Sequence, residues 1–231
     1  MTVAADDADL ELRDRLMEAT LEHIPFDGWS GSALCAGARD SEFSLNEAND
    51  LFPAGTSDMI RHFSRWADRR MIAGLDAADL SEMRTHERVA IAVELRLEGL
   101  EAHKEAVRRG LSWLAMPQNT IFGARLLYWT VDDIWYAVGD RSVDFSFYTK
   151  RGLLAGVVGS TTLFWLDDDS EGGVETSEFL DRRIVDVMRI HSARRRSKAV
   201  KTKMSDPLRI LRDVAQKRYS SVRTLGDSRL T

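Results

Sequence analysis

Histidines are the side chains in this sequence best suited to bind a metal or to transfer a proton, and they stand at positions 23, 62, 86, 103 and 191. None of them has a glutamate three residues before it, so the Glu-x-x-His pairs of di-iron helical bundles do not occur. His86-Glu87 is not followed by a histidine at position 90, which excludes the paired histidines of a zinc protease.

Acidic clusters offer no better basis for catalysis. Asp132-Asp133 and Asp167-Asp168-Asp169 could bind a divalent cation, but aspartates at helix ends more often serve as caps or as exposed charge. Glu94, Glu98 and Glu101 fall on one helical face, and the cations beside them favour a solvated surface, namely Arg96, Lys104 and Arg108. No glycine-rich phosphate loop occurs. The sequence therefore predicts a protein that is not an enzyme and that holds neither a metal nor a cofactor.

The run from Val131 to Arg151 is the segment whose composition is hardest to reconcile with an ordinary helix. It mixes large aromatic side chains, such as Trp135, Phe147 and Tyr148, with four aspartates and three cations. Exposed aromatic residues surrounded by charge are typical of a surface that binds a partner. Packing at the junction of two helices would account for the same residues, and composition alone leaves both interpretations open.

Net charge is distributed unevenly along the 231 residues. From residue 194 to the end there are twelve Lys or Arg and three Asp or Glu, a balance of +9, so the formal total of −5 leaves −14 for residues 1–193. An acidic body with a basic tail points to an anionic surface as the partner of the tail. The single Cys35 favours a reducing compartment. The early acids argue against a signal peptide, so we expect a protein that is cytoplasmic or already mature.

Helical periodicity dominates the sequence and no alternating strand pattern occurs. Proline, glycine and capping serines divide the chain into predicted helices at 10–22, 30–38, 45–51, 57–66, 82–109, 118–138, 144–165, 174–191 and 208–222. The first helices resemble the DNA-binding module of TetR-type repressors. Residues 24–63 contain only two cations against six acids, however, and this charge would repel DNA. We therefore expect a vestigial helix-turn-helix that binds no nucleic acid.

Large apolar residues are concentrated between residues 113 and 165 and could form either a core or the walls of a ligand cavity. Gly152, Gly156 and Gly159 recur at i, i+4 and i+7, so one face of that helix is bare backbone. Such a face lets a neighbouring helix pack closely or leaves room for a ligand. If this segment forms a cavity and the cavity holds a lipid, the residues predicted to bind it are Trp113, Leu114, Met116, Phe122, Leu126, Trp129, Gly152, Gly156, Val157 and Phe164.

The C-terminal segment predicts an amphipathic helix bordered by cations. Its composition is typical of a helix that lies in a membrane interface, although docking on the protein's own bundle or on a second subunit would also bury the apolar stripe. The residues predicted to bind the membrane are Leu208, Leu211, Arg212, Val214, Ala215, Lys217, Arg218 and Tyr219.

Residues 23–192 closely resemble the Coq-nine family of ubiquinone-biosynthesis accessory proteins. The segments that carry the resemblance are Ile24-Pro25-Phe26-Asp27-Gly28-Trp29, Met116-Pro117-Gln118-Asn119, Val131-Asp132-Asp133-Ile134-Trp135, and Gly139-Asp140 through Asp144-Phe145 to Tyr148-Thr149-Lys150-Arg151. The resemblance implies an all-α, TetR-like helical bundle with a C-terminal amphipathic helix. It also implies a homodimer that binds lipids, including isoprenoid quinone precursors and phospholipid, and delivers the precursors to demethoxyubiquinone hydroxylase, a di-iron enzyme.

The same resemblance places the surface for that hydroxylase on Asp132, Ile134, Trp135, Asp144, Phe147, Tyr148 and Arg151. Phe147 replaces the tryptophan usual in eukaryotic members and Lys150 replaces an arginine, and both changes keep the chemical type. We expect a helix-turn-helix-like module at 1–73, a lipid-binding domain at 74–193, and a basic linker with the membrane-binding helix at 194–231. The acidic N-terminus fits a bacterial member bound peripherally to the inner membrane. The alternatives are a lipid-responsive TetR-type regulator and an enzyme of quinone metabolism.

Overall fold

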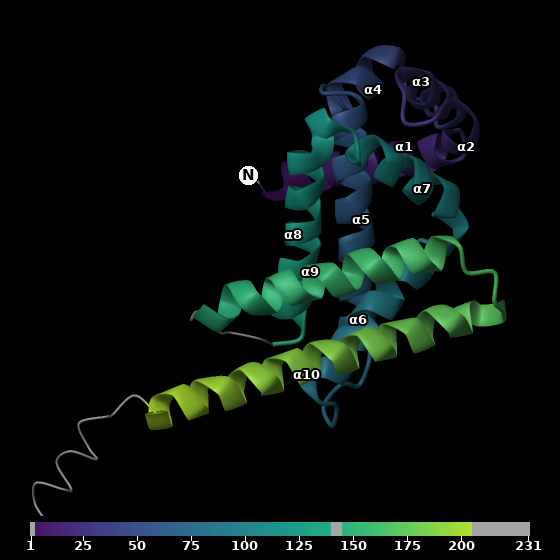
Figure 1. Ribbon diagram of the computed structural model, residues 1–231. Coiled ribbons are helices and arrows are strands. Elements are labelled where there is room, and N and C mark those ends of the chain that lie inside the picture. The colour runs from purple at the N-terminus through teal and green to yellow at the C-terminus, as the bar shows by residue number, and fades with distance from the viewer. Residues whose placement is uncertain (1–2, 140–144, 205–231) are drawn as a thin grey trace, which may run out of the picture. The chain divides into compact units, whose positions relative to one another are not determined.

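The computed structural model describes the backbone of residues 3–139 and 145–204, and the side chains of residues 7–139 and 149–189. Within these ranges every regular element is a helix, which confirms the predicted all-α class (Figure 1). The chain forms two compact units, Met1–Ile184 and Val185–Thr231. The apolar pocket and the α8–α9 segment both belong to the first unit.

Four helices form the N-terminal part of this unit: α1 (Val3–Leu21), α2 (Ile24–Asp27), α3 (Gly31–Asp40) and α4 (Leu45–Leu51). The predicted caps at Ser30 and Ser44 are confirmed. Ser30 Oγ accepts a hydrogen bond from the Ala33 amide at 3.3 Å. Ser44 Oγ accepts from the Glu47 amide at 3.2 Å while the Glu47 carboxylate accepts from the Ser44 amide at 2.8 Å. This reciprocal pair satisfies amide groups that a helix start leaves without intrahelical partners.

Helix α5 (Thr56–Ala77) is the centre of the first unit and packs against α1, α6 (Thr85–Glu98) and α8 (Thr120–Ala137) (Figure 1). Its buried face includes Met59, Phe63, Trp66 and Met71. No helix end marks the predicted domain boundary at 73/74, because α5 continues across it. This division of the chain stays a prediction.

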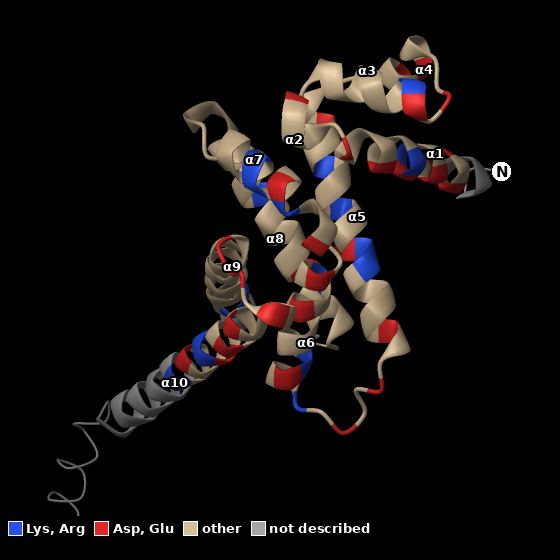
Figure 2. Ribbon diagram, turned by 90° about the vertical axis from the view of Figure 1, so that its right-hand side faces the viewer, with Lys and Arg blue, Asp and Glu red and all other residues tan. Residues whose placement is uncertain are grey.

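Ion pairs join α5 to the first helix. Asp14 on α1 contacts His62 Nε2 at 2.7 Å and Arg69 Nη2 at 2.5 Å. Both signs of charge alternate along α1 and α5 (Figure 2). Burial lowers the pKa of His62, and the neighbouring Asp14 opposes that shift.

The prediction of one long helix over 82–109 is wrong, because the chain turns after α6 ends at Glu98. Gly99 ends α6, a single 3₁₀ turn covers Glu101–His103, and α7 (Lys104–Leu114) begins in a new direction. Glycine weakens a helix, and the turn buries Leu100 at 2 % exposure. The new direction also lets Trp29 Nε1 donate a hydrogen bond to the Ala106 carbonyl at 2.9 Å.

The charged face expected to be solvated on α7 instead holds the end of α9 (Phe145–Leu166). Glu101 accepts a hydrogen bond from Trp165 Nε1 at 2.8 Å. Arg108 donates to the Leu166 carbonyl at 2.7 Å, and Lys104 donates to the Asp168 carbonyl at 3.1 Å. Cations near the last carbonyls of a helix stabilise its C-terminus, so these three residues fix where α9 ends.

A 3₁₀ turn at Pro117–Asn119 precedes α8, and a second one at Glu171–Gly173 precedes α10 (Val174–Met204). The buried Asp168 prepares the start of α10, because its carboxylate accepts from the Ser170 and Thr176 amides at 2.8 and 2.9 Å. These hydrogen bonds hold the pKa of Asp168 well below its usual range. The helical backbone of α10 continues to Met204, where a linker from residue 194 was predicted. The predicted helix at 208–222 lies outside the described residues.

Helices α1 and α3 approach each other most closely at Gly37. A Cβ atom added there would lie 2.6 Å from the Thr20 Cα atom and 2.7 Å from the Thr20 nitrogen, so backbone would have to move. At Gly31, on the same helix, an added Cβ meets no described atom within 4 Å. Close packing between α1 and α3 therefore requires glycine at position 37.

Substitution of this glycine tests the close approach. We expect Gly37→Ala to lower the free energy of unfolding by about 1–3 kcal/mol, the usual cost of overpacking a core, whereas Gly31→Ala should leave it nearly unchanged. Thermal unfolding followed by circular dichroism measures both variants. Equal melting temperatures for the two would contradict the packing described here.

Candidate functional site

An apolar pocket of about 490 Å³ opens in the first unit between α5, α6, α7, α8 and α9. Its volume lies within the range of small-molecule sites, which is roughly 300–1,000 Å³. Most of its lining is aliphatic or aromatic and includes Trp29, Ile60, Phe63, Leu111, Leu126 and Leu163. A cavity of this size and composition can accommodate part of a lipid.

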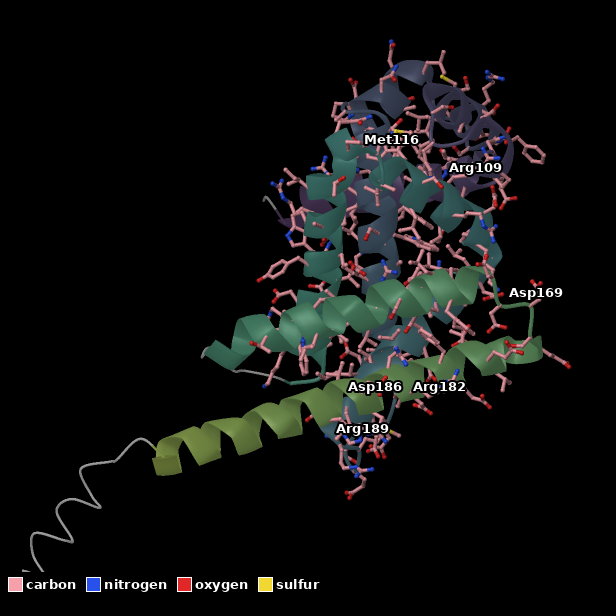
Figure 3. All side chains as sticks on the ribbon, viewed as in Figure 1. Arg109, Met116, Asp169, Arg182, Asp186 and Arg189 are labelled. Carbon is pink, nitrogen blue, oxygen red and sulfur yellow. The ribbon has the colours of Figure 1, made fainter. Side chains whose placement is uncertain are left out.

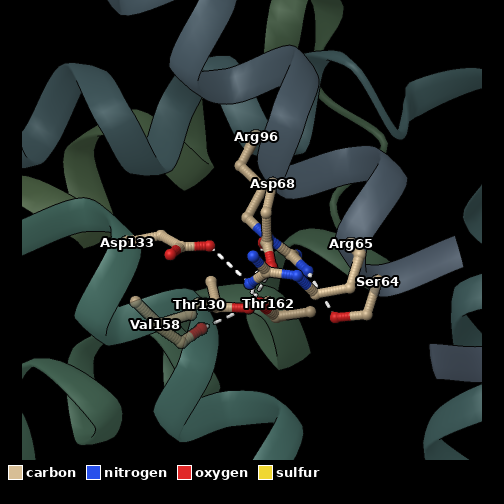
Figure 4. Close-up of polar contacts among 8 residues, drawn as sticks. All are labelled: Ser64, Arg65, Asp68, Arg96, Thr130, Asp133, Val158 and Thr162. Atoms are coloured by element: carbon tan, nitrogen blue, oxygen red, sulfur yellow. Dashed lines mark hydrogen bonds and ion pairs between the residues drawn. The ribbon is translucent and has the colours of Figure 1, made fainter. Parts of the chain in front are cut away.

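Polar side chains line only a small part of this pocket, and four of them come together (Figure 4). Arg96 Nη2 lies 3.5 Å from Ser64 Oγ. Thr130 and Thr162 are buried beside them. The Thr130 hydroxyl donates toward the Asp68 carboxylate, and the Thr162 hydroxyl donates to the Val158 carbonyl at 2.8 Å.

Behind this polar lining lies a network of charged residues built on Asp68. Arg96 Nε donates to Asp68 Oδ1 at 2.9 Å, and Arg65 Nη1 lies 3.4 Å from Asp68 Oδ2. Arg65 also donates to Asp133 Oδ2 at 2.5 Å. Burial raises the pKa of Asp133, and the Asp68 charge adds to this while Arg65 opposes it. The network joins α5, α6 and α8 at one end of the pocket.

Two of the ten predicted lipid-binding residues, Leu114 and Leu126, line this pocket. On α9 the lining residues are Val158, Gly159, Thr162 and Leu163, so Val158 and Gly159 line the pocket where Val157 and Gly156 were predicted. The other predicted residues do not line it: Trp113, Met116, Phe122, Trp129, Gly152 and Phe164.

Several of these residues have other neighbours in the structure. Trp113 and Phe122 pack edge to face with ring centroids 6.1 Å apart, and Phe164 stacks on Phe179 with centroids 4.5 Å apart. Met116 lies at the turn between α7 and α8 with 44 % of its surface exposed (Figure 3). Added Cβ atoms at Gly152 and Gly156 meet no described atom within 4 Å.

Residues outside the predicted lipid-binding segment supply much of the pocket wall. Trp29, Phe63 and Arg96 precede residue 113, and sequence reasoning assigned them to the vestigial module or to a solvated face. The aromatic residues at 29, 63 and 66 could have indicated that this part of the chain contributes to an apolar interior, because such residues seldom lie on a solvated surface.

The run Val131–Arg151 combines buried and exposed side chains. Asp132 keeps 44 % of its side chain exposed and accepts from Arg151 Nη2 at 2.6 Å, while Arg151 itself is buried. Lys150 Nζ lies 5.5 Å from the centroid of the half-buried Trp135 ring. Ile134 is fully buried in the core, so the expectation that it faces a partner is wrong.

Other residues of the predicted partner surface lie where the structure describes no side chains, namely Asp144, Phe147 and Tyr148. A residue that was not predicted, Tyr136 on α8, is 84 % exposed within the same run. Tyr128 lies two helical turns before it and is 43 % exposed.

The predicted membrane-binding residues 208–219 also lie outside the described part of the chain. In the ranges that the structure describes, no helix is both long and apolar enough to span a bilayer. The same ranges contain no group of three or more His, Cys, Asp or Glu side chains placed to hold a metal ion.

Several proteins named COQ9 are similar in sequence to this chain. The family model described as COQ9 matches residues 121–191. The ubiquinone biosynthesis protein COQ9, mitochondrial, of Rattus norvegicus is 33 % identical, over 81 % of this chain and 62 % of its own length. The protein of the same name from Homo sapiens is 32 % identical, over 81 % and 61 %. The Drosophila melanogaster protein is 31 % identical, over 78 % and 56 %. The chain thus spans about three fifths of these relatives.

A solved structure identifies the fold. The TetR transcriptional regulator from Nitrosomonas europaea superposes with a TM-score of 0.64 at 21 % identity, covering 77 % of this chain and 98 % of that one. The architecture is therefore TetR-like, as predicted. The COQ9 family is the one that the sequence resemblance indicated, and the segment that its model matches includes the sequence between α8 and α9. The chain belongs to the COQ9 family.

Proposed function

We propose that this protein is a non-catalytic accessory protein of ubiquinone biosynthesis that binds polyprenyl quinone intermediates and presents them to demethoxyubiquinone hydroxylase. The apolar pocket is the observation that carries the proposal, because its 490 Å³ lie between helices and its lining is almost wholly apolar. The names of the relatives place the COQ9 proteins in ubiquinone biosynthesis. An isoprenoid chain supplies the apolar surface that such a pocket would bury.

The proposed surface for the hydroxylase is the junction of α8 and α9. Asp132 supplies an exposed carboxylate whose position is fixed by Arg151, and Tyr136 supplies an exposed ring close to it in sequence. Tyrosine is enriched among the residues that contribute most to binding between proteins. Asp144, Phe147 and Tyr148 complete this surface by the sequence resemblance, although their side chains are not among those described.

The basic C-terminal segment would bring the pocket to its lipids. A balance of +9 over residues 194–231 favours an anionic bilayer surface, near which each cation contributes about 1 kcal/mol. We propose that the protein acts as a homodimer bound peripherally to a membrane, in a bacterium to the cytoplasmic face of the inner membrane, and that it also takes up phospholipid there.

Filling the pocket tests lipid binding. An added Cβ at Gly159 meets no described atom within 4 Å, so Gly159→Phe should fold and place a phenyl ring in the pocket. We expect about tenfold less retained isoprenoid lipid, because two excluded methylenes already cost roughly 1.6 kcal/mol. Mass spectrometry of lipid extracted from the purified protein measures the loss. Gly152→Phe is the matched control, since it adds the same ring on the same helix outside the pocket, and lipid retained equally by both variants would refute the pocket assignment.

Truncating one exposed tyrosine tests the partner surface. Tyr136→Ala should weaken association with the hydroxylase by roughly tenfold or more, as expected for a central interface tyrosine. The melting temperature should stay unchanged, because the side chain is 84 % exposed. Surface plasmon resonance with the immobilised hydroxylase measures the affinity. Tyr128→Ala is the control from the same helix, and equal affinities for both variants would remove Tyr136 from the proposed surface.

Charge reversal tests the membrane segment. Lys217→Glu/Arg218→Glu should reduce co-sedimentation with vesicles of phosphatidylcholine and phosphatidylglycerol by at least roughly tenfold at low salt. Arg182→Glu/Arg183→Glu reverses a similar adjacent pair on α10 and should bind as the unchanged protein does. Binding to pure phosphatidylcholine vesicles should be weak for all three. Undiminished binding by the 217/218 variant would show that this segment does not carry the attraction.

A further inference from the structure

An almost uncharged stretch of sequence forms the end of α7 and most of α8. Residues 110–131 contain a single charged side chain, Arg125, although 30 % of the whole chain is charged. Between the two helices lies the 3₁₀ turn at Pro117–Asn119. Figure 2 shows this turn without a charged residue, and Met116 marks its position in Figure 3. Residues 115–121 are called the α7–α8 turn below.

Large apolar side chains of the α7–α8 turn are exposed to solvent. Met116 is 44 % exposed and Ile121 is 77 % exposed. Next to them in sequence, the half-buried rings of Trp113 and Phe122 pack edge to face with centroids 6.1 Å apart. Moving a large apolar side chain out of water is favourable, so this turn has an affinity for apolar surroundings.

Hydrogen bonds within the turn satisfy carbonyl groups at the end of α7. The Trp113 carbonyl accepts from the Asn119 side chain at 2.9 Å and from the Met116 amide at 3.3 Å. The Met116 carbonyl accepts from the Asn119 amide at 2.8 Å and from the Thr120 hydroxyl at 3.2 Å. Pro117 has no amide hydrogen to satisfy. Unsatisfied backbone groups are costly where water is scarce, so this bonding suits a turn that leaves water.

The apolar pocket reaches the surface in the same part of the molecule. Ala115, Thr120 and Ala124 line the pocket and are exposed. Leu163 on α9 also lines it and is 61 % exposed. A bilayer in contact with the α7–α8 turn would therefore adjoin residues that line the pocket.

A lipid bilayer fits this turn better than a second protein does. A protein interface forms about one hydrogen bond per 100–200 Å² and buries about 800 Å² on each partner. Two exposed apolar side chains supply far less area, and the polar side chains of Gln118, Asn119 and Thr120 already bond within the turn. The lone charge of residues 110–131 is the cation Arg125, so no acid in this stretch repels phospholipid head groups.

We propose that the α7–α8 turn inserts Met116 and Ile121 into a bilayer interface beside the pocket, as a membrane contact separate from the basic C-terminal segment. Burial of apolar surface supplies the attraction, so this contact needs no anionic lipid. Asp132 and Tyr136 of the proposed hydroxylase surface belong to the opposite end of α8, which leaves both surfaces free to bind at the same time. The inference rests on the proposed function in one respect, namely that the pocket receives its lipid from the bilayer.

A fluorescent probe on the turn measures the insertion. The full chain with Cys35→Ser and Met116→Cys is labelled with the environment-sensitive dye NBD and mixed with vesicles of phosphatidylcholine and phosphatidylglycerol. We expect the emission to shift to the blue and to be quenched by phosphatidylcholine that carries a spin label on its acyl chain, because the dye enters the apolar part of the interface. The same dye at Ser81→Cys, an exposed position between α5 and α6, should show neither change.

Two results of this measurement would overturn the proposal. One is an unshifted emission from Met116→Cys at a lipid concentration where the protein sediments with the vesicles. The other is a protein that sediments with these vesicles under no condition, because a turn that inserts into a bilayer must hold some of the protein there.

Replacing the two exposed side chains tests how much the turn contributes to affinity. Glutamine has good helix propensity, and both positions are exposed, so Met116→Gln/Ile121→Gln should fold. We expect at least roughly tenfold weaker co-sedimentation with the same vesicles, by the same factor at low and at high salt, because apolar burial is lost. The loss caused by Lys217→Glu/Arg218→Glu should shrink at high salt, because salt screens charges.

The control variant removes exposed apolar side chains elsewhere. Leu12 on α1 is 43 % exposed and Met83 before α6 is 38 % exposed. Leu12→Gln/Met83→Gln should sediment as the unchanged protein does, and equal binding by the two glutamine variants would remove the turn from the membrane contact. If circular dichroism shows that Met116→Gln/Ile121→Gln is not folded, the dye measurement decides.

The outcomes separate this inference from the proposed function. If Gly159→Phe loses its retained lipid while Met116→Gln/Ile121→Gln binds vesicles as the unchanged protein does, the pocket holds lipid and the proposed membrane contact is wrong. If the dye on the turn enters the bilayer but the purified protein retains no isoprenoid lipid, the membrane contact stands and the proposed lipid-binding function is wrong.

Discussion

A single buried carboxylate, that of Asp68, determines how three helices of the first unit fit together. It has no exposed surface and lies within bonding reach of Arg96 on α6, Arg65 on α5 and Thr130 on α8. A buried charge that loses a partner destabilises a fold by about 3–5 kcal/mol, so neither α6 nor α8 can shift along α5 without breaking this network. The space between these helices has a defined shape for the same reason.

The pocket depends on this arrangement and draws on the whole first unit. Trp29, between α2 and α3, and Phe63, on α5, contribute rings that lie 5.3 Å apart, and the later helices contribute the aliphatic side. Two hydrogen bonds hold Trp29 in place. Its indole N–H donates to the Ala106 carbonyl, and its backbone carbonyl accepts from the Thr56 hydroxyl. The helix-turn-helix-like part is thus a structural wall of the cavity. Its acidic α4, with Glu47 and Asp50, is unsuited to a phosphate backbone.

Sequence reasoning succeeded where the signal was local. Ser30 and Ser44 mark helix starts because their hydroxyls accept hydrogen bonds from nearby backbone amides, and most helices were predicted from such local signals. It failed where the decisive contact was distant. Arg96 has the appearance of a solvated cation because its partner Asp68 lies 28 residues earlier. Helix α7, which follows the turn after Gly99, accepts a hydrogen bond from Trp29 at its Ala106 carbonyl, 77 residues away in sequence. Two of the ten residues predicted to bind lipid line the pocket. Helical periodicity identifies an apolar face, but it does not indicate which part of that face borders an empty space.

Side-chain contacts hold helix α9 near both ends, and its middle segment has low helix propensity. Arg151 is bound to Asp132 near its beginning, and Glu101 and Arg108 hold Trp165 and Leu166 at its end. Between these points lie Gly152, Gly156 and Gly159, each of which costs a helix up to about 1 kcal/mol relative to alanine. The backbone amides of this middle segment should therefore exchange with solvent sooner than those of α5, through local opening that leaves the ends attached. Such bowing would change the shape of the pocket wall formed by Val158 and Gly159 while the rest of the first unit remained folded.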